Sequence, residues 1–546
     1  MSRYSTGLLA SVFIMPVTLF PASAQAQQSS DEDVIIVSAS PLTRTADQAI
    51  TGFSILTGDK LEDRLAATIG ETLKLEPGVS ATSFGAGASR PIIRGQGGDR
   101  VRVLLNGVGS IDASSASPDH AVAAEPAQAE SIEVIRGAAI LRYGSSGAGG
   151  IVNVIDGRIP SEFPDGNTDV AVRFGGSSVD LGREAAASVD QRFGDFVLHL
   201  DGTFRESDNY RIPVLGESRE LLEADGEEIP DDIDDNRDLD NSFARSGGLT
   251  AGLSYIGENG FIGISVNNFT STYGIPGGHE EGEEEEEGGE EGEEEEEGDV
   301  FIELDQTRFD INAAWDFDGP IERVQAFAGY ADYEHIEFEG PGEVGTIFSN
   351  EGFEIRAEAI QAERGDWKAA YGVQYRERDF SAIGEEAFVP PTVTEQFGVY
   401  TFQEVEIGNG HLEASGRYER TDQENSVTGE DLSFDLFSVS AGGNLHLNDA
   451  FRVGISAFRT ERAPTTEELF SDGPHLATSQ FEVGDPTLDE EVALGVEGSI
   501  RYADEHRSAS VNVFYTDYED YIFEAETGGI EDGLPIFQFT GEDAEF

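Results

Sequence analysis

Cysteine is missing from this chain of 546 residues, and basic side chains are scarce. The sequence holds no Cys, and its 34 Lys and Arg stand against 107 Asp and Glu, for a formal net charge of −73. Without Cys, neither a disulfide framework nor a thiolate metal site can form. The acidic balance argues against a nucleic acid as partner, because binding phosphates needs a basic face. It favours cations or basic surfaces instead.

Long apolar runs are missing as well. A membrane-spanning helix needs at least about 18 apolar residues in a row, and no segment offers them. A shorter apolar stretch, residues 8–20, is interrupted by Pro16, follows Arg3 and precedes Ala24-Gln25-Ala26. A basic start, an apolar core and a small-x-small end are typical of a secretory signal peptide. We therefore expect residues 1–26 to be a signal peptide and the mature chain to have no transmembrane helix.

Residues 47–160 have the pattern of a mixed α/β domain. Apolar residues recur at helical spacing over residues 60–75, and Pro77-Gly78 would end that helix. Short apolar segments between Gly-rich turns predict strands at 91–95, 100–105, 131–136 and 151–155. The Gly-rich turn 143–150 has neither a Walker lysine nor a dinucleotide fingerprint, so no nucleotide site is expected there.

From about residue 165 the apolar period changes to two. In residues 196–204 and 494–502, apolar side chains alternate with polar or small ones. Segments of about ten residues with one apolar face are typical of a membrane β-barrel, although a soluble β-sandwich alternates in the same way. Short connections alternate with long ones, which are predicted near 206–243, 273–301, 334–351, 380–393, 422–433, 461–490 and 519–535. This asymmetry, with the export signal, predicts an all-β transmembrane β-barrel over residues 165–546.

The predicted barrel has about sixteen strands by Phe546. The last segment, residues 540–546, lacks the apolar alternation of a closing strand. An unpaired strand edge leaves backbone groups that lipid cannot hydrogen-bond. The chain either closes a complete barrel of sixteen strands or belongs to a larger barrel whose C-terminal strands are missing, and we favour the second interpretation.

Several short motifs resemble those of the TonB-dependent receptors of Gram-negative outer membranes. Four segments, 91–95, 103–108, 132–137 and 143–155, resemble successive plug motifs of that family. Within residues 31–40, the run Asp33, Val34, Ile35, Ile36, Val37 resembles a Ton box, the extended segment that the periplasmic protein TonB grips by strand addition.

The resemblance implies a plug domain, residues 47–160, in the lumen of an outer-membrane barrel in contact with lipid. Family barrels have about 22 strands, which supports a chain without its last strands. The resemblance further implies TonB as a partner, no cofactor and no enzymatic activity.

Within the family, the sequence is most similar to the zinc-uptake receptors. The similarity lies in residues 117–121, which include Asp119 and His120, in residues 273–277, and in residues 473–475, which end at His475. It implies one site in which Asp119 and His120 of the plug join His475 and a glutamate of the barrel loops around a transported zinc ion. We predict Glu343 as this glutamate, followed by Glu339. Imidazole and carboxylate are both ligands that Zn²⁺ accepts in a tetrahedron.

Residues 277–299 form an acidic tract with fourteen Glu, one Asp and one His, and without a hydrophobic side chain. Charges this dense repel one another and stay solvated, so we expect a disordered extracellular loop. Its residues, beginning with His279, Glu280 and Glu281, would concentrate divalent cations without holding them, because Zn²⁺ prefers imidazole to carboxylates alone.

These features predict TonB-dependent uptake of a metal ion, most of all zinc, across the outer membrane. A receptor for a ferric siderophore or another metal chelate is the first alternative, but acidic loops suit a bare cation better. A passive porin or an adhesin-type barrel is the second, but a plug is superfluous in an open pore. No nucleophile–base pair or hydrolytic metal motif occurs, so we do not expect an enzyme.

Overall fold

The computed structural model describes most of the chain from residue 36 onward. The described residues are 36–37, 41–42, 44–45, 50, 52–146, 148–213, 238–279, 299–340, 342–384, 387–475, 478–504, 506–531 and 533–546. The predicted signal peptide and the residues Asp33, Val34, Ile35, Glu280 and Glu281 lie outside them. Strand β1 (Ile36–Val37), at the end of the predicted Ton box, pairs antiparallel with β2 (Arg44–Thr45).

The first domain, which we call the plug, is built on a mixed five-stranded sheet in the order β3-β8-β9-β6-β7. Strands β6 and β9 run parallel and the other neighbours antiparallel. The plug strands and 3₁₀ helices are β3 (Ser54–Thr57), β4 (Val79–Ala81), β5 (Pro91–Ile93), η2 (Gly98–Arg100), β6 (Val101–Leu105), β7 (Val108–Gly109), η3 (Pro126–Gln128), β8 (Ser131–Ile135), η4 (Gly137–Arg142) and β9 (Gly150–Ile155). The four predicted strands are therefore confirmed.

The single helix predicted over residues 60–75 is wrong. Two short helices form instead, α1 (Gly58–Glu62) and α2 (Ile69–Leu73). Thr68 lies in extended backbone between them, and its side chain accepts a hydrogen bond from the Glu71 amide. Thr68 therefore caps a new helix rather than continuing the first one. The helical spacing survives because the apolar residues of both helices face the same core.

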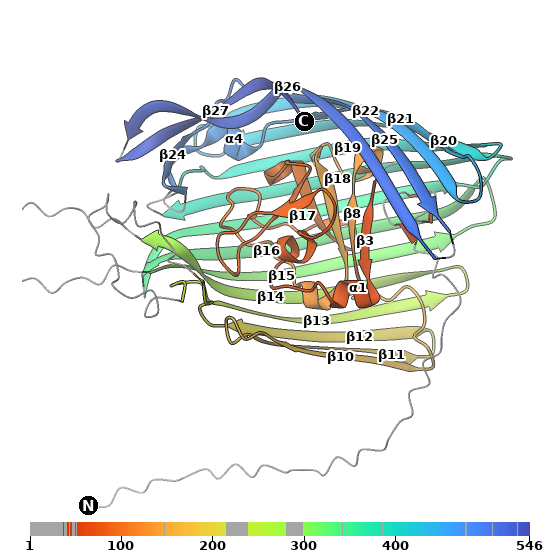
Figure 1. The fold of residues 1–546 in the computed structure, drawn as a ribbon, viewed down its shortest axis with the longest axis horizontal. Coiled ribbons are helices and arrows are strands. Elements are labelled where there is room, and N and C mark those ends of the chain that lie inside the picture. Colours follow the sequence, from red (N-terminus) through yellow and green to blue (C-terminus); the bar gives the residue numbers. More distant parts are fainter. Residues whose placement is uncertain are drawn as a thin grey trace, which may run out of the picture. The chain divides into compact units, whose positions relative to one another are not determined.

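The plug is followed by one antiparallel sheet that curves around it (Figure 1). Its strands are β10 (Thr168–Gly176), β11 (Arg183–Phe193), β12 (Phe196–Ser207), β13 (Ala244–Gly257), β14 (Gly260–His279), β15 (Asp299–Asp316), β16 (Ile321–Gly340), β17 (Glu343–Gln361), β18 (Trp367–Gly384), β19 (Thr392–Ile407), β20 (Gly410–Asn425), β21 (Glu430–His446), β22 (Phe451–Arg462), β25 (Glu491–Ala503), β26 (Ser508–Glu531) and β27 (Leu534–Glu545). We call these strands the wall.

One hairpin leaves the wall. After the short helix α4 (Thr466–Phe470), strands β23 (Asp472–His475) and β24 (Gln480–Val483) form a hairpin, while β22 pairs directly with β25. Strand β24 also pairs in parallel with β27. Among the described residues no ladder joins β10 to β27. The absence of C-terminal strands stays a prediction.

The wall shows the alternation expected of a barrel. On β12, Val197 and His199 are buried against the plug, whereas Phe196, Leu200 and Phe204 are 42–46% exposed on the outer face. An apolar outer face with a polar inner face is the pattern of a barrel in lipid. In the part of the chain that the structure describes, no helix is both long and apolar enough for a membrane span.

Four of the predicted long loops are at least half strand. The hairpins β16–β17, β18–β19, β20–β21 and β26–β27 turn over a few residues each, and β16 and β26 reach 20 and 24 residues. A bilayer needs only about 9–11 residues per strand. These hairpins therefore continue beyond the bilayer, where the outer face no longer has to be apolar. The apolar alternation that predicts a strand from sequence weakens there, so the strands extend past the ends that it predicts.

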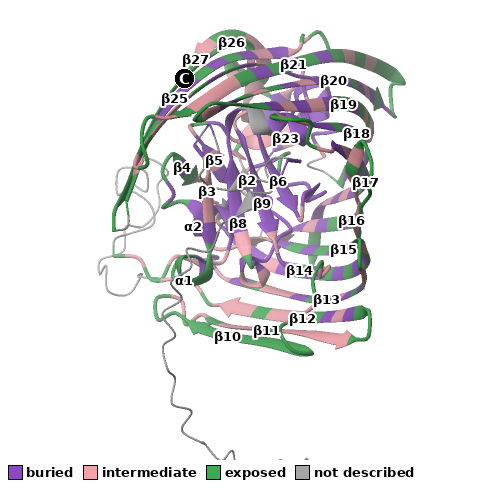
Figure 2. Ribbon diagram, turned by 90° about the vertical axis from the view of Figure 1, so that its right-hand side faces the viewer, coloured by how far each residue is buried: buried purple, intermediate pink, exposed green. Residues whose placement is uncertain are grey.

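Buried ion pairs join the plug to the wall, and we call them the ion-pair belt. They are Arg94–Glu497 (2.9 Å), Arg100–Glu491, Arg102–Glu354 (2.5 Å), Arg142–Glu358 (2.6 Å) and Arg158–Asp310 (3.2 Å). At Gly252 of β13 the two parts touch so closely that a side-chain carbon would overlap the Arg158 carbonyl oxygen. Figure 2 shows the plug strands β6, β8 and β9 as buried inside the wall. A charge left unpaired in such a place is costly, so the belt fixes the plug in one position.

Candidate metal centre

The predicted Asp-His pair lies in a plug loop between β7 and β8. Asp119 and His120 are 1% and 0% exposed. Tyr273 of β14 holds this loop, because its hydroxyl donates to the Asp119 carbonyl at 3.0 Å and accepts from the Ala121 amide at 2.9 Å. One side chain of the wall thus pairs the backbone on both sides of His120.

The hydrogen bonds of His120 determine which ring nitrogen can bind a metal. Nδ1 lies 3.1 Å from the Ala113 carbonyl oxygen, which only accepts, so Nδ1 carries the hydrogen. In the neutral ring, Nε2 then directs a lone pair toward Glu337 Oε1 at 3.0 Å and Asp119 Oδ2 at 3.8 Å. A lone pair that faces two carboxylates is repelled unless a proton or a metal ion lies between them.

Protons would compete with a metal ion for this place. Burial opposes ionisation of His120, but the Asp119 carboxylate and then Glu337 outweigh burial and raise the pKa of the ring. Burial likewise opposes ionisation of Asp119, yet His120 and His475 hold its pKa well below the ordinary value. The surroundings of the two side chains therefore favour a positive charge beside the Asp119 carboxylate, and a divalent cation could supply it.

Strand β16 of the wall brings two further ligand groups. His335 and Glu337 are two residues apart, so both point inward, and they are 0% and 8% exposed. His335 Nε2 lies 3.5 Å from Glu337 Oε1, and its Nδ1 lies 2.8 Å from the Tyr333 hydroxyl. An outer hydrogen bond of this kind orients a metal-binding imidazole.

The β23–β24 hairpin supplies the third histidine. His475 Nδ1 donates to Glu482 Oε1 at 2.6 Å, and Nε2 lies 3.0 Å from Ser117 Oγ and 3.7 Å from Asp119 Oδ1. Burial opposes ionisation of His475, but Asp119 and Glu482 raise its pKa well above the ordinary value. The hairpin thus closes over the plug loop through one imidazole.

Aromatic rings enclose the three histidines. Phe348 of β17 packs on His120 and His335, with ring centroids 4.8 and 4.6 Å apart, and Phe388 stacks on His475 at 4.4 Å. Phe348 and Phe388 are each 1% exposed. Apolar walls exclude water and strengthen the charge interactions inside them.

Two buried polar atoms at this place lack a hydrogen-bond partner within the described parts of the chain. They are Asp119 Oδ2 and His335 Nε2. Buried polar atoms are nearly always paired, so each unpaired one calls for an explanation. Across the described residues, one group of side chains has ligand atoms close enough to share a metal, namely His120, His335 and Glu337, whose ligand atoms lie within 4.8 Å of one another.

The structure brings together Asp119, His120 and His475 of the predicted set, but not Glu343. Glu343 is exposed at the first residue of β17, and Glu339 lies one inward position beyond Glu337. Strand β16 continues to Gly340 instead of ending in a loop. Glu337 therefore points inward beside His120, where the sequence predicted Glu343. His279 ends β14 opposite Asp299, while the rest of the predicted cation-attracting residues lie outside the described part.

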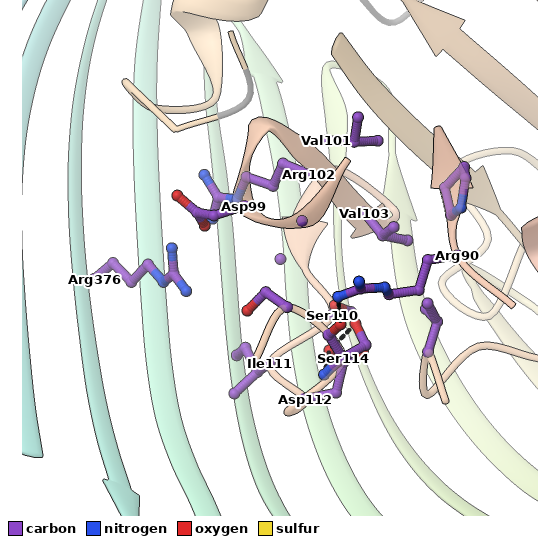
Figure 3. A pocket seen from close by; sticks show the side chains of 15 residues that line it. Arg90, Asp99, Val101, Arg102, Val103, Ser110, Ile111, Asp112, Ser114 and Arg376 are labelled. Carbon is purple, nitrogen blue, oxygen red and sulfur yellow. Dashed lines mark hydrogen bonds between the residues drawn. The ribbon is translucent and has the colours of Figure 1, made fainter. Parts of the chain in front are cut away.

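The plug loop borders a cavity of about 60 Å³ on another side (Figure 3). Asp112 accepts hydrogen bonds from Ser114 there, Arg90 donates to the Ser114 carbonyl, and Arg376 of β18 approaches the same space from the wall. This volume holds a few water molecules. The loop that carries Asp119 and His120 therefore has room to shift.

Two family models match the chain. The barrel of the TonB-dependent receptors, described as "TonB dependent receptor-like, beta-barrel", matches residues 232–543, and the TonB-dependent receptor plug domain matches residues 45–151. The chain belongs to the TonB-dependent receptor family. Membership identifies residues 45–151 as a plug domain and places the receptor in the outer membrane, and this family comprises transporters rather than enzymes.

Curated relatives match over part of their length. The chain is 31% identical over 175 residues to the vitamin B12 transporter BtuB of Photobacterium profundum, and 26% identical over 223 residues to the hemin receptor of Yersinia pestis. These matches cover 31% and 39% of this chain. They span only 28% and 33% of the two relatives.

Solved structures show the same fold. The copper transporter OprC has a TM-score of 0.71 at 15% identity, and covers 88% of this chain and 72% of its own. The FrpB iron transporter from Neisseria meningitidis (F3-3 variant) has a TM-score of 0.67 at 15% identity, with 88% and 74% covered. At this identity the likeness concerns the fold and leaves the substrate open.

Proposed function

We propose that this receptor imports a divalent transition-metal ion, and zinc in particular, across the outer membrane. The convergence of His120, His335 and Glu337 beside Asp119 carries the proposal. Three of their separations, 3.0, 3.5 and 3.8 Å, lie near the edge of a zinc tetrahedron, roughly 3.3 Å for bonds of 2.0–2.1 Å, and the ligand atoms of His120, His335 and Glu337 all lie within 4.8 Å of one another. An ion among them would also satisfy Asp119 Oδ2 and His335 Nε2.

The ligand types favour zinc over other metals. Two imidazoles with two carboxylates suit Zn²⁺, whereas Ca²⁺ and Mg²⁺ prefer oxygen alone. Cu(I) prefers thiolate or thioether, and the sequence has no Cys and only Met1 and Met15, both within the predicted signal peptide. Cu²⁺ binds most nitrogen and oxygen sites more tightly than Zn²⁺, so metal supply as well as affinity decides which ion is taken up.

A bare ion fits the enclosure better than a metal chelate does. The three imidazoles and the two carboxylates beside them are at most 8% exposed, and aromatic rings cover them. A siderophore would have to displace the β23–β24 hairpin and Phe388 to reach Asp119. The chelate alternative therefore requires a large rearrangement that the ion does not.

An acidic cavity of about 500 Å³ supports a cation as the transported species. It lies between the plug and β10–β12, near the short β11–β12 turn, and Asp156, Asp190 and Asp201 are among its lining residues. His199 bridges two of these, at 2.9 Å from Asp190 and 2.8 Å from Asp201. Clustered negative charge lowers the energy of a cation that moves past the plug.

Energy would come from TonB through the segment 33–37. TonB would add a strand to this segment, and β1 already shows that Ile36 and Val37 can pair as a strand. A pull on the plug would move Asp119 and His120 away from His335 and Glu337 of the wall. Separating the ligands in this way releases the ion.

A matched pair of glutamate variants tests the proposal. Glu337→Gln keeps the shape but removes the carboxylate from the centre, and Glu343→Gln makes the same change six residues away at an exposed position. We expect the first variant to weaken zinc binding by at least about 100-fold, beyond the 10–100-fold typical of a metal's outer partners, and the second to bind like wild type. Zinc titration of the purified receptor and zinc uptake by cells with and without TonB provide the two measurements.

Three results would contradict the proposal. Equal zinc affinity of the two variants would remove the metal centre. Zinc uptake that does not depend on TonB would favour a passive pore. Uptake of a ferric chelate, without zinc binding by the wild-type receptor, would favour the chelate alternative.

A further inference from the structure

The three histidines are not equally close to one another. The ring centroids of His120 and His335 are 4.4 Å apart, but those of His120 and His475 are 6.5 Å apart. Two imidazoles on one Zn²⁺, with bonds of about 2.0–2.1 Å, have centroids about 5 Å apart in a tetrahedron. His120 and His335 can therefore share an ion with little movement, whereas His120 and His475 would have to approach by about 1.5 Å to do so.

Asp119 faces both groups with different oxygens. Its Oδ2 lies 3.8 Å from His120 Nε2, and its Oδ1 lies 3.7 Å from His475 Nε2. A carboxylate with one oxygen toward each of two nitrogens can bridge two metal positions, or pass an ion from one oxygen to the other.

We propose that the centre contains two adjoining positions for a divalent transition-metal ion, with Asp119 shared between them. The first, which we call the strand position, is formed by His120, His335, Glu337 and Asp119 Oδ2. The second, the hairpin position, is formed by His475 Nε2, Asp119 Oδ1 and the Ser117 hydroxyl, which contacts both. This inference rests on the proposed function and specifies the route of the ion through the site.

The two positions differ in strength because they differ in ligands. The strand position has three protein ligands whose atoms lie within 4.8 Å of one another, and Asp119 Oδ2, 3.8 Å from His120 Nε2, would be the fourth. The Ala113 carbonyl and the Tyr333 hydroxyl orient its two imidazoles. The hairpin position has one imidazole, one carboxylate oxygen and the neutral Ser117 hydroxyl, so water would complete its coordination, while Glu482 orients His475. An ion at the hairpin position is therefore held loosely, and it gains ligands by moving to the strand position.

Charge limits how long both positions can be filled. Asp119, Glu337 and Glu482 supply three negative charges to a buried site. One divalent ion leaves an excess of one negative charge, and a second ion turns this into an excess of one positive charge. The second ion must therefore bind more weakly than the first, and its arrival favours departure of the ion ahead of it, as in multi-ion channels.

The ligands of both metal positions come from different parts of the fold, the plug and the wall, which could move apart. The hairpin position depends on β23–β24, which β27 holds through the parallel β24–β27 ladder, and the strand position depends on β16. Asp119 and His120 alone belong to the plug. A plug movement would thus break both positions at once and carry the shared carboxylate with it.

Metal stoichiometry of the purified receptor at buffered free zinc tests the two positions. We expect wild type to bind a tight and a weak ion with imidazole ligands. His475→Ala should lose only the weak ion, and His335→Ala should lower the affinity for the tight ion by at least about 100-fold while a weak ion remains. His411→Ala is the control, because His411 is also buried but is the second residue of β20 and belongs to neither position.

Titration of wild type with Co²⁺ gives a second measurement in case a variant fails to fold. Imidazole-bound tetrahedral cobalt absorbs far more strongly than cobalt on the acidic tract, so the tract does not obscure it. A strong absorption step is expected as the strand position fills, followed by a second and weaker step as the hairpin position fills. One step, or one zinc ion lost equally in His335→Ala and His475→Ala, overturns the two-position inference but leaves metal uptake intact. Wild type that binds neither zinc nor cobalt at imidazole sites overturns the proposed function itself.

Discussion

Removal of the Tyr273 hydroxyl should weaken metal binding without touching a ligand. Tyr273→Phe keeps the ring in its buried place but deletes the hydrogen bonds to the Asp119 carbonyl and the Ala121 amide, at 3.0 and 2.9 Å. Each lost bond costs about 0.5–1.5 kcal/mol net, and more where the backbone group stays unpaired. The loop conformation that presents His120 should thus lose about 2 kcal/mol relative to other conformations.

This loss converts into affinity through the fraction of receptors in the binding conformation. Apparent affinity falls in proportion to that fraction, and about 2 kcal/mol corresponds to a factor of up to about 30. Zinc titration of the purified variant measures it. Tyr330→Phe is the control, because its hydroxyl bonds Glu351 on the exposed side of β16. If Tyr273→Phe binds zinc within twofold of wild type while Tyr330→Phe does the same, Tyr273 does not position the loop and the reasoning is refuted.

Three further predictions concern pH, energy and supply. Zinc affinity should fall as pH decreases, and the fall should begin above the ordinary histidine pKa of about 6.5. The reason is that Asp119 and Glu337 raise the pKa of His120, where protons compete with the metal. Zinc titrations between about pH 5.5 and 8 that show no loss of affinity until well below pH 6.5 would contradict this. Ile36→Pro removes a backbone hydrogen-bond donor from the segment that TonB would bind. Zinc accumulation in cells should therefore stop, while zinc binding to the purified receptor persists. Normal accumulation would show that this segment is not the Ton box. Deletion of residues 279–297 removes fourteen carboxylates and should slow uptake mainly at limiting zinc and low salt, because charge attraction is screened beyond about 10 Å at 0.1 M salt. An unchanged rate under those conditions would make the tract a solvated spacer.

The fold was predictable where physics leaves a periodic trace. Apolar side chains at every second position predict the wall strands within the bilayer, because lipid favours apolar side chains on the outer face and the inner face, toward the plug, is polar. The same trace disappears above the bilayer, so the extensions of β16 and β26 were missed. Thr68 was missed for another reason, since apolar spacing continues across the break between α1 and α2 and only the cap reveals it.

Local motifs predicted part of the metal centre, but the residues that depend on the extent and alternation of β16 could not be found in this way. Asp119, His120 and His475 stand in short motifs that resemble known ones, and the structure brings them together. His335 and Glu337 belong to no motif, and the strand was expected to end before Glu337. Period two applied to residues 333–337 would have placed Tyr333, His335 and Glu337 on one face. Their distance from His120 follows from plug packing, which the sequence alone does not give.

The ion-pair belt has a mechanical consequence that depends on the direction of load. Near its N-terminal end the plug is hydrogen-bonded to β25, where the Ile50 carbonyl accepts from Ser499 and the Gly52 amide donates to Glu497. A pull on that end would stretch these hydrogen bonds first, then the Arg94–Glu497 pair, and then the later pairs in turn. Because each pair would then bear the force alone, a small force would suffice to break it. Pressure spread over the outer surface loads all pairs together and meets their summed resistance. The same ion pairs therefore hold the plug in place against pressure spread over its outer surface, but separate one after another when the N-terminal end is pulled.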